Sequence, residues 1–203
     1  MHKELLVSTY QHLIEFQNAL SKYTGAPYVV LTSRCTHSIE LCMRLNNVKH
    51  VTMPKHTYVS ALMACYIAGA TVEFTDDFWD YEYCYGGTNI WDSARGLNQN
   101  MYRPGQMQCL SFGAGKRLEL MSGGAILLDN KEQYKQLTCM AYDGRDPDYH
   151  PWHTQPTWRI GYHYNMLYET AELGCNMLKN KQLKRLGSQL VEYPDVSKLK
   201  IEV

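Results

Sequence analysis

The chain has 203 residues, and its 20 Lys and Arg are balanced by 20 Asp and Glu, so the formal net charge is zero. This balance argues against a nucleic-acid-binding arm or a basic membrane-binding patch, and no apolar run reaches the roughly 18 residues of a membrane-spanning helix. Since 45% of the residues are hydrophobic, the chain can bury a core, and we expect one domain or two small ones.

The cysteines point to a reducing compartment. There are 7 of them, an odd number, and no two are spaced as a CxxC pair, which favours neither a zinc knuckle nor a disulfide framework. Most lie in apolar stretches, where a free thiol packs as a small hydrophobic group. The first residues are amphipathic and include Glu4, unlike the unbroken apolar core of a secretion signal. We therefore expect a cytoplasmic protein.

Helices and short apolar strands alternate along the first half of the chain. Apolar residues at helical spacing predict a helix over 3–22, and the continuous apolar run at 28–31 is typical of a buried strand. The following predicted elements are a helix over 37–46, a strand over 50–53, a helix over 57–68 and a strand over 71–75.

The second half continues the alternation after an acidic, aromatic segment at 76–88 that we predict to be a loop. Its predicted elements are strands at 89–91, 107–112 and 124–128, a helix over 131–141, a loop over 143–162 and a helix over 165–186. This order predicts an α/β fold of three layers with a mostly parallel central sheet. We expect residues 1–186 to form a single domain and residues 187–203 a weakly structured tail.

Chemically unusual residues follow the first two strands, at the sheet edge where such folds bind ligands. Ser33–His37 opens a helix, whose free N–H groups and dipole attract anions. Tyr58 follows the next strand and could stack on a flat cofactor. Each feature has an ordinary alternative, a helix cap for the first and a core aromatic for the second.

Asp92 and Lys116 follow two later strands. A carboxylate at a strand end can pair with a buried cation, although a helix N-cap is the ordinary role of Asp92. Lys116 stands in a turn of small residues; a lysine that is partly desolvated and near another cation loses its proton more easily and can form a Schiff base. The alternative for Lys116 is a solvated surface position.

In this order and spacing, the motifs resemble the DegT/DnrJ/EryC1 family of sugar aminotransferases, which are fold-type I pyridoxal-phosphate (PLP) enzymes. The resemblance rests on Ser111, Phe112 and Lys116 ahead of Gly123–Ile126, and it covers about residues 15–186. Further segments that carry it are Ser33–Ser38, Pro54–Tyr58, Ala68–Asp76, Trp91–Gly96 and Gly161–Met166.

The resemblance implies a PLP-binding large domain at 1–186 and a role for each matching residue. Lys116 would form the Schiff base with PLP and carry a proton during transamination, and Asp92 would pair with the protonated pyridine nitrogen. Tyr58 would stack on the ring, and the phosphate would be held at the first strand's end and by Ser111. Family members are homodimers with shared sites, in which His163 of the partner chain would complete the phosphate site. The implied cofactor-binding residues are Thr36, His37, Tyr58, Asp92, Arg95, Ser111, Lys116 and His163, and no metal ligand is implied.

The chain also departs from the family pattern. Arg95 replaces the usual Gln or His near the phenolic oxygen of the ring, where a fixed cation would favour the phenolate. His163 replaces an Asn, which would make phosphate binding sensitive to pH, and Cys35 and His37 replace small residues. The segment between 76 and 89 is too short for the strand and crossover helix usual there, and the sequence stops where members continue into a small domain.

Two functions follow as hypotheses. The first is a PLP-dependent transaminase that moves an amino group from an amino acid, with glutamate as the expected donor, to a keto group of a nucleotide-linked sugar. The second is a non-catalytic remnant, a dimeric module that binds PLP or a partner protein, which the absent small domain motivates. The joint presence of Lys116, Asp92 and Ser111 favours the enzyme, because a scaffold does not need all three.

A third hypothesis concerns the polar aromatic loop at 143–162. His150 and His153 have metal-like spacing and could act with His163, but no acidic or cysteine partner stands beside them. The ordinary reading is a set of loop histidines at the mouth of a substrate site. Trp152, Trp158 and Arg159 of the same loop could contact a sugar or its nucleotide.

Overall fold

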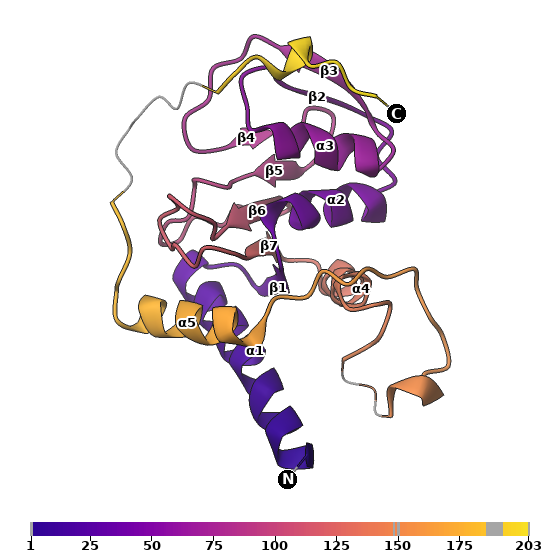
Figure 1. The fold of residues 1–203 in the computed structure, drawn as a ribbon, viewed down its shortest axis with the longest axis vertical. Coiled ribbons are helices and arrows are strands. Elements are labelled where there is room, and N and C mark those ends of the chain that lie inside the picture. The colour runs from indigo at the N-terminus through magenta and orange to yellow at the C-terminus, as the bar shows by residue number, and fades with distance from the viewer. Residues whose placement is uncertain (1, 148, 150, 186–192, 203) are drawn as a thin grey trace.

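A five-stranded sheet forms the centre of the molecule in the computed structural model, which describes residues 2–147, 149, 151–185 and 193–202 (Figure 1). In space the strands follow the order β1, β7, β6, β5 and β4. Their bounds are β1 (Tyr28–Thr32), β4 (Tyr83–Cys84), β5 (Ile90–Asp92), β6 (Met107–Ser111) and β7 (Gly124–Leu128). A second sheet pairs β2 (His50–Pro54) in parallel with β3 (Thr71–Thr75).

The prediction of a mostly parallel sheet is wrong for the five-stranded sheet. β7 is antiparallel to both β1 and β6, β4 is antiparallel to β5, and only β5 and β6 pair in parallel. The reason lies in the connection between β6 and β7, residues 112–123, which holds no helix; parallel neighbours usually need a helical crossover, so the chain turns back on itself instead. β1, β5 and β6 still run in one direction, because β1 and β6 both oppose β7.

The segment predicted as a loop at 76–88 contains β4 and connects the two sheets. The backbone N–H of Gly86 donates to Thr52 O at 2.8 Å, and the two residues form an antiparallel bridge between the small sheet and this segment. A side chain at position 86 would collide with the Thr52 side chain, so the approach depends on glycine. A two-residue strand therefore stands where the family pattern suggests a strand and a crossover helix.

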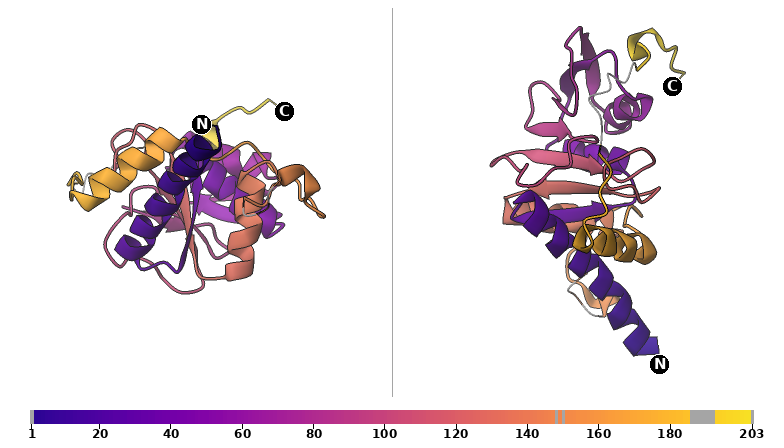
Figure 2. Two further views of the ribbon diagram at one scale, coloured as in Figure 1. Left: turned by 90° about the horizontal axis from the view of Figure 1, so that it is seen from below. Right: turned by 90° about the vertical axis from the view of Figure 1, so that its left-hand side faces the viewer.

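Helices cover both faces of the sheet and give the predicted three layers (Figure 2). One face carries α2 (Cys35–Leu45), α3 (Val59–Ile67) and α4 (Lys131–Ala141), and the other carries α1 (His2–Thr24) and α5 (Tyr168–Lys179), which lie side by side. β7 shows the alternation expected of a strand between two layers: Ile126 and Leu128 enter the core beneath α2, whereas Ala125 and Leu127 enter the core beneath α1. No helix in the described ranges has both the length and the apolar character needed to cross a membrane.

α5 is shorter than the helix predicted over 165–186, whose last residue lies outside the described part of the chain. The helix ends at Lys179, and Lys181 adopts a left-handed backbone with φ 55°. The chain then packs against the β6–β7 connection, because the backbone N–H of Lys184 donates to Arg117 O at 2.8 Å. The end of α5 thus supports the segment that carries Lys116.

We predict that Gly124→Ala lowers the free energy of unfolding by about 1–3 kcal/mol, the usual cost of overpacking a core. A Cβ at Gly124 would lie 2.5 Å from Cys35 N and 2.7 Å from Arg34 O, and this backbone cannot move without displacing the start of α2. Urea unfolding measures the change. Gly113→Ala is the matched control, since its Cβ would meet only Ser111 Oγ at an ordinary 3.6 Å. Equal losses in both variants would contradict the prediction.

Candidate functional site

A cavity of about 450 Å³ opens where β1, β5 and β6 reach their carboxyl ends. Its size lies in the range of small-molecule sites. The polar and aromatic side chains around it are Arg34, Cys35, Thr36, Thr57, Tyr58, Ser60, Trp79, Asp92, Arg95, Ser111, Lys116 and Tyr193. The structure therefore brings together the predicted cofactor-binding residues, apart from His37 and His163.

Two helices begin at this cavity. Arg34 precedes α2 and Tyr58 precedes α3, and neither side chain caps the N–H groups of its helix. Just inside the two helices, Thr36 Oγ1 donates to Ser60 Oγ at 2.9 Å, which joins their first turns. Backbone donors and the positive ends of two helix dipoles converge here, so this part of the cavity can hold an anion such as a phosphate.

Asp92 ends β5 and is only 8% exposed. Burial raises the pKa of its carboxyl group, whereas a hydrogen bond from Ala94 N at 3.0 Å, the charge of Lys116 and a hydrogen bond from Tyr83 lower it. The Tyr83 hydroxyl also bonds to Thr57 Oγ1 at 3.0 Å, which ties it to the start of α3. A carboxylate in this position needs a nearby cation to stay ionised.

Lys116 lies in the β6–β7 connection. Burial lowers the pKa of its amine and the neighbouring Arg95 lowers it further, while Asp92 and Cys35 raise it. The turn is fixed by Glu119, whose Oε2 accepts from Gly115 N at 2.6 Å, and by Gly115 itself, which takes a left-handed φ of 73°. A partly buried lysine with a lowered pKa is more often neutral at physiological pH and is then a nucleophile.

The remaining two polar groups near Lys116 differ in their chemistry. Ser111 ends β6, and its hydroxyl accepts a weak hydrogen bond from Gly113 N at 3.4 Å, which leaves its own proton available to a ligand. Cys35 opens α2, and burial, then the charge of Asp92, raise the pKa of its thiol well above the usual value. Cys35 is therefore a neutral side chain beside the amine, although it was noticed in the sequence only as a departure from the family pattern.

His37 and His163 do not line this cavity. The His37 ring stacks on Tyr164 with ring centres 3.8 Å apart, and its Nδ1 lies 2.8 Å from Ser33 Oγ. Burial, together with the charge of Arg34, lowers the pKa of His37 despite the opposing effect of Glu40. The backbone of His37 lies in the first turn of α2, which begins at the part of the cavity that can hold an anion.

His163 follows the loop after α4 and is 80% exposed. Its Nδ1 lies 3.0 Å from Asp143 Oδ1, so the pair can form an ion pair when the imidazole is protonated. Within one chain His163 is separate from the cavity, and any contact with PLP would have to be made to another copy of the chain.

Sequence reasoning missed three aromatic side chains at the cavity. Trp79 and Tyr193 line the cavity, whereas Tyr83 lies behind it and bonds to Asp92. Trp79 and Tyr83 belong to the segment interpreted as a loop, and Tyr193 belongs to the segment interpreted as a tail. Neither segment has the periodic apolar pattern that identifies a buried element. The abundance of aromatic residues at 76–88 was a signal, because large aromatic side chains tend to be buried in cores, interfaces or binding sites, but the tail at 187–203 has Tyr193 as its one aromatic residue and gave no such signal.

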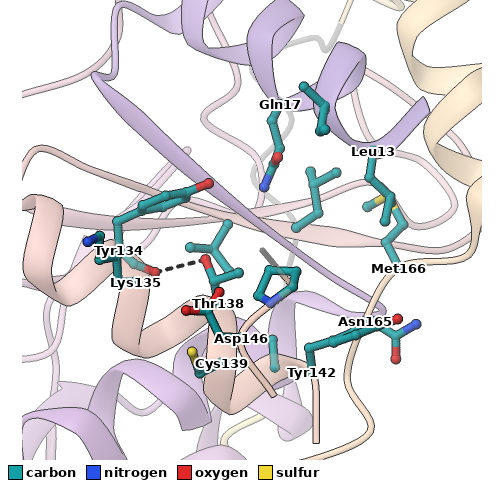
Figure 3. Close-up of a pocket in the computed structure, with 15 residues that line it drawn as sticks. Leu13, Gln17, Tyr134, Lys135, Thr138, Cys139, Tyr142, Asp146, Asn165 and Met166 are labelled. Atoms are coloured by element: carbon teal, nitrogen blue, oxygen red, sulfur yellow. Dashed lines mark hydrogen bonds between the residues drawn. The ribbon is translucent and has the colours of Figure 1, made fainter. Parts of the chain in front are cut away.

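A second cavity, of about 210 Å³, lies between α1 and α4 beside β1 (Figure 3). Its lining is mostly apolar, and its polar contacts include the bond from Thr138 Oγ1 to Tyr134 O at 2.8 Å and the bond from Gln17 Nε2 to Val29 O at 2.9 Å. Lys135 and Asp146 are its charged residues, and none of the predicted site residues reaches it. The chemistry of the side chains therefore favours the cavity around Lys116 as the functional site.

The metal hypothesis remains a prediction, because His150 lies outside the described residues. Over the ranges that the structure describes, no three or more His, Cys, Asp or Glu side chains are grouped as metal ligands. Trp152 and Trp158 pack edge to face with ring centres 6.0 Å apart, and neither lines the Lys116 cavity.

The class of protein is defined by an α/β fold with a lysine and a buried aspartate in one cavity, and the sequence comparison gives its family. The profile of the DegT/DnrJ/EryC1/StrS aminotransferase family matches residues 1–81 and 93–191. The chain belongs to this family. No curated protein matches the sequence.

Solved structures share the fold at low sequence identity. NtdA from Bacillus subtilis, solved with bound cofactor PMP, is 18% identical, with a TM-score of 0.68, over 83% of this chain and 48% of that one. Helicobacter pylori PseC, an aminotransferase involved in the biosynthesis of pseudoaminic acid, is 14% identical, with a TM-score of 0.67, over 84% of this chain and 58% of that one.

The aminotransferase TlmJ from Streptoalloteichus hindustanus is 18% identical, with a TM-score of 0.68, over 83% of this chain and 58% of that one. The chain thus spans between 48% and 58% of the length of these three proteins. The likeness establishes a common fold.

We predict opposite changes in the reactivity of Lys116 when its two charged neighbours are neutralised. Asp92→Asn removes a charge that raises the pKa of Lys116, and Arg95→Gln removes one that lowers it. The pH midpoint of Lys116 acylation should therefore fall in the first variant and rise in the second. Peptide mass spectrometry measures both, with exposed Lys131 as the internal control. Shifts in the same direction would contradict the arrangement.

Proposed function

We propose that this protein is a PLP-dependent aminotransferase that moves an amino group from an amino acid, glutamate, to the keto group of a nucleotide-linked sugar. The observation that carries the proposal is the meeting of Lys116 and Asp92 in one cavity, beside two uncapped helix N-termini. These groups fit PLP, which combines a carbonyl, a basic ring nitrogen and a phosphate. Membership of the aminotransferase family supports the same reaction, as does the PMP bound to NtdA.

When bound, PLP supplies an electron sink for the carbanion that forms at the amino-bearing carbon. Lys116 is the residue that would hold the carbonyl group of PLP through its Nζ atom, and as a free amine it would accept and return a proton, for which its lowered pKa is suited. The Asp92 carboxylate would pair with the protonated ring nitrogen and would keep that nitrogen charged. Tyr83 and Ala94 orient this carboxylate through their hydrogen bonds.

The other groups bind and orient the cofactor. Thr36, Ser60 and the first N–H groups of α2 and α3 would hold the phosphate, and the Ser111 hydroxyl would donate to it. Tyr58, which is 60% exposed, offers its face to the ring. Arg95 places a cation near Lys116, which favours the neutral amine.

A homodimer with shared sites belongs to the same proposal. His163 is exposed on a loop away from the cavity of its own chain, as a residue that reaches a partner's phosphate must be. Residues 1–186 form the cofactor-binding domain, the substrates are small molecules, and the free cysteines are consistent with a cytoplasmic enzyme.

A non-catalytic module is the second candidate. Such a module would not respond to any amino donor, whether or not it binds PLP. The lowered pKa of Lys116 beside a buried carboxylate favours catalysis, since a scaffold gains nothing from a desolvated amine.

Borohydride reduction of the PLP-loaded protein should attach the cofactor to the peptide that contains Lys116, as read by mass spectrometry. Lys116→Ala should abolish the attachment, because the amine that binds PLP is gone, whereas Lys131→Ala, a change on the exposed start of α4, should leave it intact. Attachment at another lysine in the wild-type protein would show that Lys116 is not the cofactor's partner.

Mixing two inactive variants tests the shared site. Lys116→Ala chains and His163→Ala chains should regain activity when combined, because a mixed dimer contains one site with both residues intact. In the simplest case a random mixture recovers about a quarter of the wild-type activity, as expected for two-fold symmetric dimers. Mass spectrometry confirms that mixed dimers form; without recovery in their presence, the role of His163 in the partner's site would be excluded.

A further inference from the structure

The C-terminal segment Tyr193–Leu199 packs beside the start of α3, at the cavity (Figures 1 and 2). His56 Nδ1 donates to Tyr193 O at 3.0 Å, and Val196 N donates to Lys55 O at 2.9 Å. The Val196 side chain is buried, with 2% exposure, in the core beneath α2 and α3. The segment is therefore anchored by both backbone hydrogen bonds and an apolar contact.

The Tyr193 ring joins two aromatic side chains from other parts of the chain. It stacks on Trp79 with ring centres 5.5 Å apart and an angle of 13° between the planes. It meets Tyr58 edge to face, with centres 6.4 Å apart. Trp79 is itself held in place, because its Nε1 donates to His56 O at 2.8 Å. Three segments thus meet in one aromatic wall.

This wall connects to the groups that carry the chemistry. Trp79 packs edge to face on Tyr83, with centres 5.0 Å apart, and Tyr83 bonds to Asp92. Tyr193, Tyr58 and Lys116 line the same cavity. A displacement of Tyr193 would therefore remove a contact of the Tyr58 ring and widen the cavity on the side where Tyr58 stands.

We propose that the segment Tyr193–Leu199 is a fixed wall of the active site, and that Tyr193 is a positioning residue that holds the ring of Tyr58 against the cofactor. The segment covers this side of the cavity and restricts access to Lys116. The positioning role rests on the proposed function, because that function identifies the ring against which Tyr58 packs as PLP. The restriction of access to Lys116 does not depend on the proposed function.

The rate at which trinitrobenzenesulfonate modifies Lys116 in the full chain without PLP tests the wall directly. Tyr193→Ala should raise this rate about threefold or more, because a large aromatic ring is removed from the cavity. Tyr193→Phe keeps the ring and should match the wild type, and so should Lys200→Ala, which changes the exposed residue that follows the segment. Val196→Ala, which loosens the anchor, is a second test if Tyr193→Ala fails to fold, and it should also raise the rate.

The affinity for PLP tests the positioning role. Tyr193→Ala should weaken PLP binding about three- to tenfold, the scale of one aromatic contact, and Tyr193→Phe should restore it. If the rate of Lys116 modification is unchanged in both Tyr193→Ala and Val196→Ala, the segment does not restrict access to Lys116. If the affinity for PLP is unchanged in Tyr193→Ala, Tyr193 has no positioning role. If the wild-type protein takes up no PLP, both the proposed function and the positioning role are wrong. The rate of Lys116 modification then still tests whether the segment restricts access to Lys116.

Discussion

The meeting of the Lys116 amine and the Asp92 carboxyl group in one cavity is the constraint on which the rest of the site depends. Burial raises the pKa of Asp92 and lowers that of Lys116, so each group is pushed towards its neutral form, and each charge opposes that change in the other. Neutralising either group therefore moves the pKa of the other towards the value that burial alone would favour. A protonated ring nitrogen would offer Asp92 another cation once the amine of Lys116 is engaged.

The fold brings these two groups together because β5 and β6 are neighbouring strands that run in the same direction. Asp92 ends β5, and Lys116 follows β6, which is parallel to β5 and pairs with it directly. The reversal of β7 makes the sheet mostly antiparallel, yet it leaves both carboxyl ends at one edge. Asp92 and Lys116 were expected to lie close together because each follows a strand, and they line one cavity. The prediction of a mostly parallel sheet was wrong, but it did not affect this expectation.

Other parts of the site could not be predicted, because they depend on contacts between distant segments. The family resemblance implied that the backbone at His37 holds the phosphate, which stays a prediction, but nothing in the sequence indicated that the His37 ring stacks on Tyr164. Trp79 and Tyr193 lie in segments without periodic apolar pattern, and only the folded chain places their rings in contact. The family resemblance was stronger evidence than any single motif, and the profile match supports it over most of the chain.

The most direct measurement is the absorption spectrum of the protein loaded with PLP, before and after glutamate is added. The account predicts a visible band that disappears as the cofactor takes up the amino group, and that returns when a keto acid is supplied. In Asp92→Asn the band should remain while its response to glutamate slows greatly, because the ring nitrogen loses its anionic partner. A wild-type spectrum that glutamate and every other amino donor leave unchanged would contradict the account and favour a non-catalytic module.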